Sequence, residues 1–274
     1  MDESSLYNSP YNDDDYEWLL ENIARHFQLD LRGYKQHRVR RRIDMIMRKY
    51  SYSDYKAYFH DLTRDGKLWD EFLDKLTINV TEFFRNPEKW SYLKKEILPK
   101  LLKESGSRTK IWSAGCSTGE EPYTHAILLE ELNAPKSIKI LATDLDKFVI
   151  EKAKKGIYTE RSLVNVPEDI RKKYFRKVDS NNYEVLSFVK NRVVFKQHNL
   201  LMDPFEKDFD LISCRNVVIY FDMEAKNKLY KNFAKSLRKG GVLFVGSTER
   251  IFNYKSLGLE VVEPFFYQKV EEKY

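Results

Sequence analysis

The fold of this chain is decided by the stretch Lys110-Ile111-Trp112-Ser113-Ala114-Gly115-Cys116-Ser117-Thr118-Gly119-Glu120-Glu121-Pro122. Its apolar start predicts a buried strand, and its end, with Pro122, suits the first turn of a helix. Between them, Gly115 and Gly119 allow the backbone to turn and to come close to a ligand. A strand, a small-residue turn and a helix in this order indicate a ligand-binding loop of an α/β fold.

The charge on this loop restricts the ligand. A phosphate-binding loop offers bare N–H groups and a Lys or Arg, because helix N-termini attract anions. Glu120 and Glu121 would repel a pyrophosphate and favour a ligand with positive charge. S-adenosylmethionine, with its sulfonium and ammonium groups, is such a ligand. Carboxylates in a first helical turn also complement the helix dipole, so we assign that role to Glu120 and ligand contact to Glu121.

Composition is that of an ordinary globular protein. The chain has 274 residues, of which 42% are hydrophobic, enough for a substantial core. No apolar run approaches the roughly 20 residues that span a bilayer, and the acidic N-terminus is unlike a signal peptide. We therefore expect a cytoplasmic protein. Cys116 and Cys214 are too few for a disulfide framework and have no metal-ligand spacing, so we expect reduced thiols and no metal.

The chain divides by composition into an all-α part and an α/β part. Apolar residues at helical spacing predict four helices in the first part, at 16–27, 36–50, 54–62 and 68–80. We expect the following boundaries: a disordered tail at 1–12, an N-terminal helical domain at 13–86, a linker helix and loop at 87–107, and the α/β domain at 108–274.

The second predicted helix has one apolar and one cationic face. Its apolar residues are Val39, Ile43, Ile46 and Met47, and its cationic face carries Arg38, Arg41, Arg42 and Arg48. Such a face is often only a solvated surface. Its excess of basic residues favours partner binding, and we prefer an acidic protein surface over nucleic acid as the partner.

Short apolar runs alternate with amphipathic helices in the α/β part, which predicts a parallel sheet. We expect strands at 110–116, 138–144, 192–198, 209–214, 241–247 and 261–270. An insertion at about 157–191 is too long for a simple crossover. Its segment 182–189 alternates like an exposed antiparallel ribbon, which would suit either peptide capture by strand addition or mere decoration of the crossover. Both interpretations stay open.

Residues that follow the carboxyl ends of parallel strands meet at one edge of a sheet, where α/β folds bind their ligands. Asp144 ends the second strand about 20 residues after the glycines, the position of a ribose-hydroxyl partner. Asp146 is the alternative, although it also suits a helix cap. The later strand ends supply the remaining candidates, which are Asn199, Leu200, Cys214, Arg215 and Tyr220.

Together with Asn79-Val80-Thr81-Glu82-Phe83-Phe84-Arg85 and Cys214-Arg215-Asn216-Val217-Val218-Ile219-Tyr220-Phe221, these residues closely resemble the CheR-type chemotaxis receptor methyltransferases, which are protein-glutamate O-methyltransferases. The resemblance runs from the arginine helix to the end of the chain. It implies an all-α domain followed by a Rossmann-like S-adenosylmethionine-dependent methyltransferase domain with a small antiparallel β-subdomain. The cofactor contacts that it implies are Asn79, Thr81, Arg85, Gly115, Glu121, Asp144, Asn199, Leu200, Cys214 and Arg215.

The resemblance also implies the partners. Family members place the arginine helix against the cytoplasmic helices of chemoreceptors, and some bind a receptor's C-terminal peptide through the β-subdomain. The enzyme would thus be recruited from the cytoplasm to membrane-bound receptors. We expect a monomer that neither binds nucleic acid nor inserts into the membrane.

The sequence offers no obvious pair of acid and base residues, and methyl transfer to a glutamate does not need one. A glutamate side chain has a reference pKa near 4.3, so the acceptor is already an anion and the enzyme's main task is positioning. Arg85 can bind a carboxylate through its fork, either that of the methionine moiety or that of the incoming glutamate. Tyr220 can donate a hydrogen bond to the acceptor. We expect both residues to steer rather than react.

Two other functions remain compatible with the sequence. The sequence pI of about 9.0 and the arginine helix would suit a nucleic-acid methyltransferase. A cofactor-binding adaptor without turnover would also fit. Cys214 as a pyrimidine-attacking nucleophile is disfavoured, because no Pro-Cys motif surrounds it.

Overall fold

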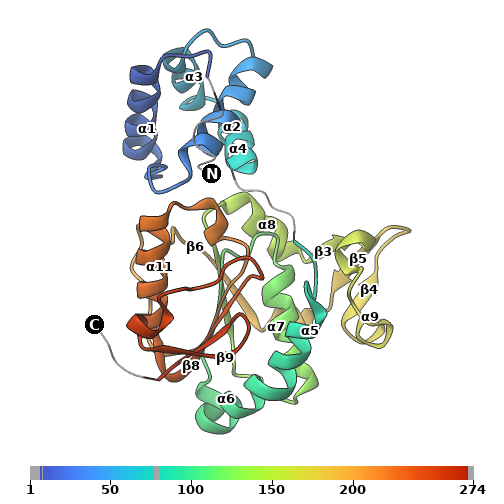
Figure 1. The fold of residues 1–274 in the computed structure, drawn as a ribbon. Helices are drawn as coiled ribbons and strands as arrows, with labels where there is room; N and C mark the ends of the chain where they lie inside the picture. Colours follow the sequence, from blue (N-terminus) through green and yellow to red (C-terminus); the bar gives the residue numbers. More distant parts are fainter. Residues whose placement is uncertain (1–6, 8, 77–80, 271–274) are drawn as a thin grey trace. The chain divides into compact units, whose positions relative to one another are not determined.

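The computed structural model describes residues 7, 9–76 and 81–270, and the chain forms two compact units. The helical unit comprises Met1–Asn79 with Tyr220–Lys228, and the sheet unit comprises Val80–Ile219 with Leu229–Tyr274. Figure 1 shows the helices and strands of the chain, coloured along the sequence. The division at residue 79 lies before the boundary at 86 expected from composition. Asn79 itself lies outside the described residues.

All four expected helices are present in the helical unit. They are α1 (Asp13–Phe27), α2 (Gln36–Lys49), α3 (Tyr55–Leu62) and α4 (Gly66–Leu76). The first begins three residues earlier than expected because Asn12 caps it, accepting a hydrogen bond from the N–H of Asp14 at 2.8 Å. Asp54 caps α3 in the same way through Ala57.

Residues expected in a disordered tail contact the helical unit. The Tyr7 hydroxyl donates to Asp44 at 2.8 Å, and the Tyr11 hydroxyl donates to the carbonyl of Tyr52 at 3.3 Å. Asp44 is fully buried in α2 and also accepts from Tyr55 at 2.7 Å. A buried carboxylate thus anchors the chain just before α1.

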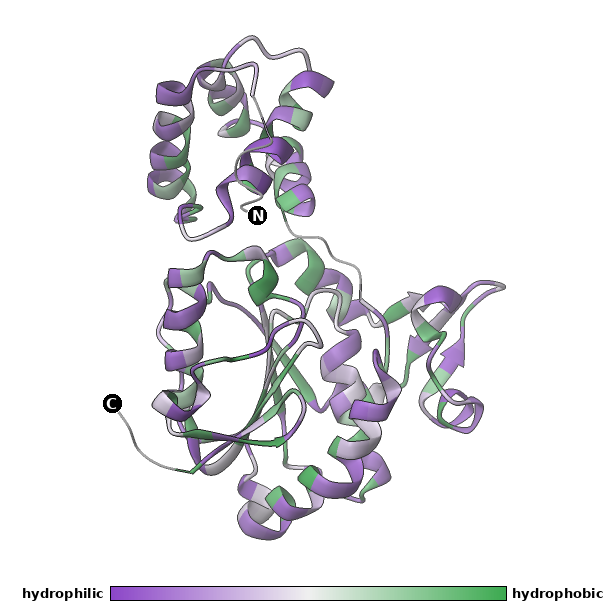
Figure 2. Cartoon of the chain, in the orientation of Figure 1, coloured by the Kyte–Doolittle hydropathy of each residue, from purple (hydrophilic) through white to green (hydrophobic). Residues whose placement is uncertain are grey.

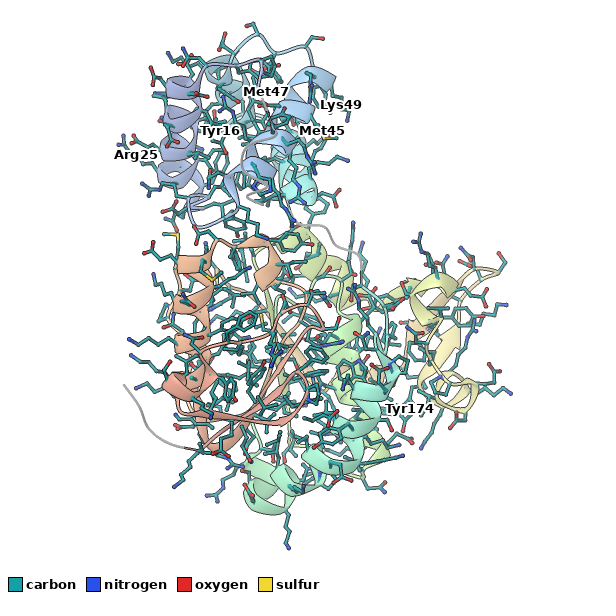
Figure 3. The ribbon with its side chains drawn as sticks, in the orientation of Figure 1. Tyr16, Arg25, Met45, Met47, Lys49 and Tyr174 are labelled. Atoms are coloured by element: carbon teal, nitrogen blue, oxygen red, sulfur yellow. The ribbon has the colours of Figure 1, made fainter. Side chains whose placement is uncertain are left out.

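The two faces of α2 follow the predicted pattern. Val39, Ile43, Ile46 and Met47 are buried. Figure 3 labels Met47, which is fully buried, and Met45, which is 53% exposed on the same helix. Arg41 and Arg48 are exposed, whereas Arg38 and Arg42 are half-buried.

A seven-stranded sheet forms the centre of the sheet unit, in the order β6-β2-β1-β7-β8-β10-β9. Its strands are β1 (Ile111–Ala114), β2 (Ile140–Asp144), β6 (Val193–Gln197), β7 (Phe209–Cys214), β8 (Leu237–Val245), β9 (Leu259–Glu263) and β10 (Phe266–Lys269). The first five strands in this order are parallel to one another. The strand β10 pairs antiparallel with β8 on one side and with β9 on the other. The single last strand expected at 261–270 is therefore a hairpin, which turns at Phe265 with φ +77°.

The position of β1 creates the topological switch. Trp112 lies opposite Leu141 of β2 on one side and Ile212 of β7 on the other. After β1, the chain adds β2 and β6 on one side of this strand, and later adds β7 and β8 on its other side. The loop after β1 therefore lies where ligands bind in such sheets.

Helices pack on the sheet, and Figure 1 shows α7 and α11 on opposite sides of it. The helices of this part of the chain are α5 (Pro87–Tyr92), α6 (Leu98–Ser105), α7 (Glu120–Glu131), α8 (Lys147–Lys155), α9 (Glu168–Tyr174), α10 (Ser187–Lys190) and α11 (Met223–Ser236). The strands between them are strongly apolar (Figure 2). The segment expected as a linker forms α5 and α6, and buries Trp90, Leu93 and Leu98 in the core of the sheet unit.

The insertion forms a second sheet in the order β3-β5-β4, with strands β3 (Ile157–Thr159), β4 (Phe175–Lys177) and β5 (Asn182–Val185). This subdomain, with α9, projects from the body of the sheet unit (Figure 1). The ribbon expected at 182–189 ends at Val185, and a helical turn follows. Because β5 is the central strand, the free edges belong to β3 and β4 rather than to the alternating segment.

Within the described residues, no helix combines the length and apolar character needed to cross a bilayer.

Candidate functional site

The glycine loop after β1 is fixed to the end of β2. The N–H groups of Gly115 and Cys116 both donate to the carbonyl of Thr143, at 2.8 and 2.9 Å. Gly115 has φ +77°, and a Cβ placed on it would lie 2.4 Å from a methyl carbon of Val217. The loop therefore requires glycine here both for its backbone angle and for its contact with the segment after β7.

Asp144 lies at the end of β2, directly beside this loop. Its carboxylate accepts the N–H of Ser117 at 2.8 Å and that of Asp146 at 3.0 Å. Burial raises the pKa of Asp144 to about 6, and the backbone hydrogen bonds act against that rise. Asp146 caps α8 by accepting the N–H of Phe148 at 2.7 Å. Asp146 therefore acts as a helix cap, one of the two roles that the sequence allowed for it, and the ribose contact of Asp144 stays a prediction.

The two glutamates of α7 have different partners. The Glu120 carboxylate accepts hydrogen bonds from the hydroxyl of Thr118 at 2.7 Å and, at 3.4 Å, that of Ser162. Glu121 accepts from Ser113 of β1 at 2.8 Å, and its other oxygen lies 3.7 Å from Arg215. Burial raises the pKa of both carboxyls. Glu120 is therefore tied into the protein, whereas Glu121 is one half of a buried ion pair.

Arg215, the other half, is enclosed by aromatic rings. Its guanidinium carbon lies 4.5 Å from the ring centre of Phe244 and 5.3 Å from that of Trp90. One terminal nitrogen donates to the carbonyl of Arg85 at 2.8 Å and to the side chain of Asn86 at 2.9 Å. The Nε of Arg215 is buried, and among the described residues it has no hydrogen-bond partner. Such an unsatisfied donor is expected to be paired when a ligand is bound.

The segment at 81–86 is held in this site by its backbone. The carbonyl of Arg85 also accepts from the indole of Trp90 at 2.9 Å, and the N–H of Phe84 donates to the Thr124 hydroxyl at 3.3 Å. Phe84 and Asn86 both have positive φ angles. Thr81, the first described residue of the segment, is half-buried. The fold therefore brings Arg85, a cofactor candidate far away in the sequence, next to Arg215.

Asn199 and Leu200 follow β6 and are both nearly buried. The N–H of His198 donates to the carbonyl of Asp144 at 2.8 Å, which fixes the end of β6 to the end of β2. The side chain of Asn199 accepts the N–H of Leu201 at 3.0 Å, and its own N–H donates to Asp203. The Asn199–Leu200 pair is thereby placed at the same sheet edge as Asp144.

The thiols of Cys116 and Cys214 are buried, and burial raises the pKa of each. Because β1 and β7 are neighbours, Cys116, which follows β1, and Cys214, which ends β7, belong to adjacent strands. Neither environment produces the thiolate that a nucleophile needs.

Tyr220 is grouped with the helical unit rather than with the other candidates. It ends a turn of 3-10 helix at Val218–Tyr220. Its carbonyl accepts the N–H of Lys35 at 3.0 Å, and the Arg42 guanidinium lies over its ring at 5.7 Å.

Sequence reasoning missed two buried residues of this site, Trp90 and Glu249. Trp90 gave no signal, since an apolar residue in a helix is normally core. Glu249 follows the carboxyl end of β8, at the same sheet edge as Asp144 at the end of β2, so the strand-end rule would have found it. It is 4% exposed and accepts the N–H groups of Asn216, Val218 and Gly246.

The groups at this edge fit S-adenosylmethionine. The buried carboxylate of Asp144 and the largely buried one of Glu121 can pair with the ribose hydroxyls and the ammonium, and the unsatisfied Nε of Arg215 can pair with a carboxylate. Within the described residues, no group of three or more His, Cys, Asp or Glu side chains is arranged to hold a metal ion.

Comparison with known proteins gives the same result for both parts of the chain. Residues 14–77 match the CheR methyltransferase all-alpha domain, and residues 79–263 match the CheR methyltransferase SAM binding domain. A chemotaxis protein methyltransferase of Listeria innocua is 41% identical over 255 residues, which cover 93% of this chain and 97% of that protein.

More distant relatives align with nearly as much of the chain. A chemotaxis protein methyltransferase of Borreliella burgdorferi is 35% identical, over 93% of this chain and 94% of that protein. Chemotaxis protein methyltransferase 2 of Vibrio cholerae is 31% identical, over 88% and 85%. The resemblance and the fold class expected from the sequence are confirmed. With its all-α part, its parallel sheet and its S-adenosylmethionine-binding domain, this chain belongs to the CheR methyltransferase family.

Proposed function

We propose that this protein transfers the methyl group of S-adenosylmethionine to glutamate side chains of chemoreceptors, giving glutamate methyl esters and S-adenosylhomocysteine. The observation that carries this proposal is a pair of carboxylates around a glycine loop at the switch point of the sheet, namely Asp144, which is buried, and Glu121, whose side chain is 12% exposed. The relatives named chemotaxis protein methyltransferases support the receptor as substrate.

The side chains near the site suit an acceptor that is already an anion. His125 is fully buried, its Nε2 lies 2.7 Å from the Ser213 hydroxyl, and burial lowers its pKa to about 3. The thiol of Cys214 is held neutral by burial. Neither group is suited to remove a proton near neutral pH, and a glutamate carboxylate does not require it.

The protein's task is then to bind and orient. When bound, S-adenosylmethionine supplies an electrophilic methyl group on a positively charged sulfur. Asp144 and Glu121 would hold the cationic and hydroxyl groups, and Arg85 would bind a carboxylate with its forked guanidinium. Tyr220, at the end of the loop after β7, would donate a hydrogen bond to the acceptor. Asn79, Thr81, Asn199, Leu200, Cys214 and Arg215 complete the proposed contacts.

The exposed arginines of α2 are the proposed receptor-binding surface. Arg41 and Arg48 are exposed, and Arg38 lies half-buried on the same cationic face. Chemoreceptor helices that offer glutamates to the enzyme are acidic, so charge attraction would speed their encounter. Esterification removes negative charge from those helices, and this change would shift the receptor's signalling equilibrium during adaptation.

The small subdomain would bind a receptor's C-terminal peptide. A hollow of about 300 Å³ is lined by Glu160, Glu168, Arg171, Lys172, Phe175, Lys177 and Tyr183. It combines cationic groups, which suit a terminal carboxylate, with aromatic rings and the free edge strand β4. Calorimetry with a receptor tail peptide, compared with the same peptide amidated at its end, tests this contact. Equal affinity for both forms would contradict it.

The function itself is tested with receptor-containing membranes and methyl-labelled S-adenosylmethionine. We expect a label on the receptor that is released by mild base, since methyl esters hydrolyse readily. A label on nucleic acid would identify the other methyltransferase function. Cofactor binding without any transfer would identify an adaptor. Arg85→Ala should lower cofactor affinity or transfer, and a variant unchanged in both would remove Arg85 from the site.

A further inference from the structure

The loop after β7, which we define as residues Asn216, Val217, Val218 and Ile219, is held by a carboxylate from another strand end. Glu249 lies in the turn after β8, and one of its oxygens accepts the N–H of Asn216 at 2.6 Å and that of Gly246 at 2.8 Å. Its other oxygen accepts the N–H of Val218 at 2.8 Å. One buried side chain thus satisfies three backbone donors from two segments.

The carboxylate of Glu249 is closely surrounded by the two segments that it binds. Asn216 has φ +59°, an uncommon angle for a residue with a side chain. A Cβ placed on Gly246 would lie 2.5 Å from the Glu249 carboxylate and 2.8 Å from the N–H nitrogen of Asn216. The loop is therefore bent toward Glu249 and requires glycine on the facing strand end. Burial raises the pKa of Glu249, and the backbone donors act against that rise.

The same loop lies between two residues of the proposed function in the sequence. Arg215, which is paired with Glu121, directly precedes it, and Tyr220 directly follows it. In its middle, Val217 lies against Gly115 of the glycine loop, in the space that a Cβ would need. A shift of this loop would therefore move groups that are proposed to bind the cofactor and the acceptor, whereas the hydrogen bonds of the Glu249 carboxylate all go to backbone N–H groups.

We propose that Glu249 is a positioning residue for methyl transfer, which holds the loop after β7 in its active conformation through these three hydrogen bonds. This inference rests on the proposed function. It assigns a role to a residue outside the contacts that the sequence predicted. The direct consequence is that transfer should depend on Glu249 more strongly than cofactor affinity does, because the acceptor must be aligned to a fraction of an ångström.

The first test is Glu249→Gln. The amide replaces one acceptor oxygen with an NH₂ group that itself donates, so at least one of the three backbone N–H groups loses its acceptor. We expect hydrogen exchange in the cofactor-free protein to become faster in the peptide that contains 216–219. The transfer rate to receptors should fall about tenfold or more, whereas the S-adenosylhomocysteine affinity measured by calorimetry should change less than about threefold.

The matched control is Glu260→Gln, an equivalent change at an exposed glutamate of β9. Transfer by Glu249→Gln within about twofold of this control would overturn the proposal. Equal losses of cofactor affinity and transfer would also overturn it, since they indicate general damage to the site. Wild-type protein that binds S-adenosylhomocysteine but methylates no receptor would refute the proposed function instead, and the exchange experiment would still report on the anchor.

A second variant tests the anchor from the opposite side. Gly246→Ala places a methyl group in the space of the carboxylate and of Asn216, while Glu249 stays in the sequence. It should reproduce the faster exchange at 216–219 and the slower transfer. This variant also serves if Glu249→Gln does not fold. Unchanged exchange and unchanged transfer in folded Gly246→Ala protein would contradict the proposed anchor.

Discussion

Asp144 shows how the fold controls the charge of one residue. Its carboxyl is buried beside the glycine loop, and burial raises its pKa to about 6, although two backbone N–H groups donate to it. The group is therefore ionised at neutral pH but close to its titration. A ligand that pairs with the ionised form must lose affinity when the carboxyl is protonated.

We predict that the affinity for S-adenosylhomocysteine falls as the pH is lowered through about 6. Calorimetry between about pH 8 and 5 measures this, and Asp144→Asn should bind more weakly with little dependence on pH. The pKa of Asp144 in the folded protein, about 6, lies above that of an ordinary aspartate, so this group stabilises the fold at low pH and that contribution is lost as pH rises through about 6. Weaker binding at pH 5 caused by unfolding would appear in a thermal melt.

Asp44 is a second buried carboxylate with a defined structural role. It accepts the hydroxyls of Tyr7 and Tyr55 within the helical unit. We predict that Asp44→Ala destabilises this unit by about 2 kcal/mol, because buried donors lose their acceptor. Urea unfolding followed by circular dichroism measures the change. Asp74→Ala, at an exposed position of α4, is the control. Equal stability of the two variants would show that the tyrosines find other acceptors.

At the scale of the element, α2 separates arginines that hold the fold from arginines that face solvent. Arg42 donates to the carbonyl of Leu76 at the end of α4 and lies over the ring of Tyr220. Arg40 pairs with Asp13. Arg41 and Arg48 are exposed, although Arg48 also donates to the carbonyl of Asp44. A charge reversal at Arg42 would therefore change the stability of the fold as well as receptor binding, so the two effects could not be separated.

We predict that Arg41→Glu combined with Arg48→Glu slows receptor methylation about tenfold or more, because each reversed charge is repelled by an acidic partner. The affinity for S-adenosylhomocysteine should stay unchanged. Arg64→Glu, an exposed arginine outside α2, is the control and should leave methylation at the wild-type rate. If the control slows methylation equally, net charge rather than the α2 surface attracts the receptor.

For the whole molecule, the formal net charge of +6 and the cationic face of α2 predict a dependence on salt. Exposed charges are screened beyond about 10 Å at about 0.1 M ionic strength, whereas buried pairs such as Glu121–Arg215 are screened much less. We predict that raising the salt from about 0.05 to 0.5 M lowers the rate of receptor methylation at limiting receptor concentration but preserves cofactor affinity. Equal salt dependence of both measurements would place the screened charges in the cofactor site.

Much of this protein was determined by sequence alone. Local pattern predicted the four helices of the helical unit and the strand–turn–helix around Gly115, because apolar periodicity and glycine preferences act over a few residues. The strand-end rule selected Asp144 and Arg215, because the carboxyl ends of parallel strands share one edge of the sheet. The lengths of the strands were predicted less accurately, because the expected last strand is a hairpin and the ribbon expected at 182–189 ends at Val185.

Only the tertiary structure decided which distant groups meet. It brought the carbonyl of Arg85, the indole of Trp90 and the guanidinium of Arg215 together, and it placed Glu249 under the loop after β7. It also made β5 a central strand and buried the side chains of Trp90, Leu93 and Leu98, from the segment expected as a linker, in the core. These contacts depend on strand order and on the burial of polar groups, which have no periodic signal along the chain. Sequence pattern therefore predicted most of the candidate residues at this sheet edge, and packing determined how their charges are paired.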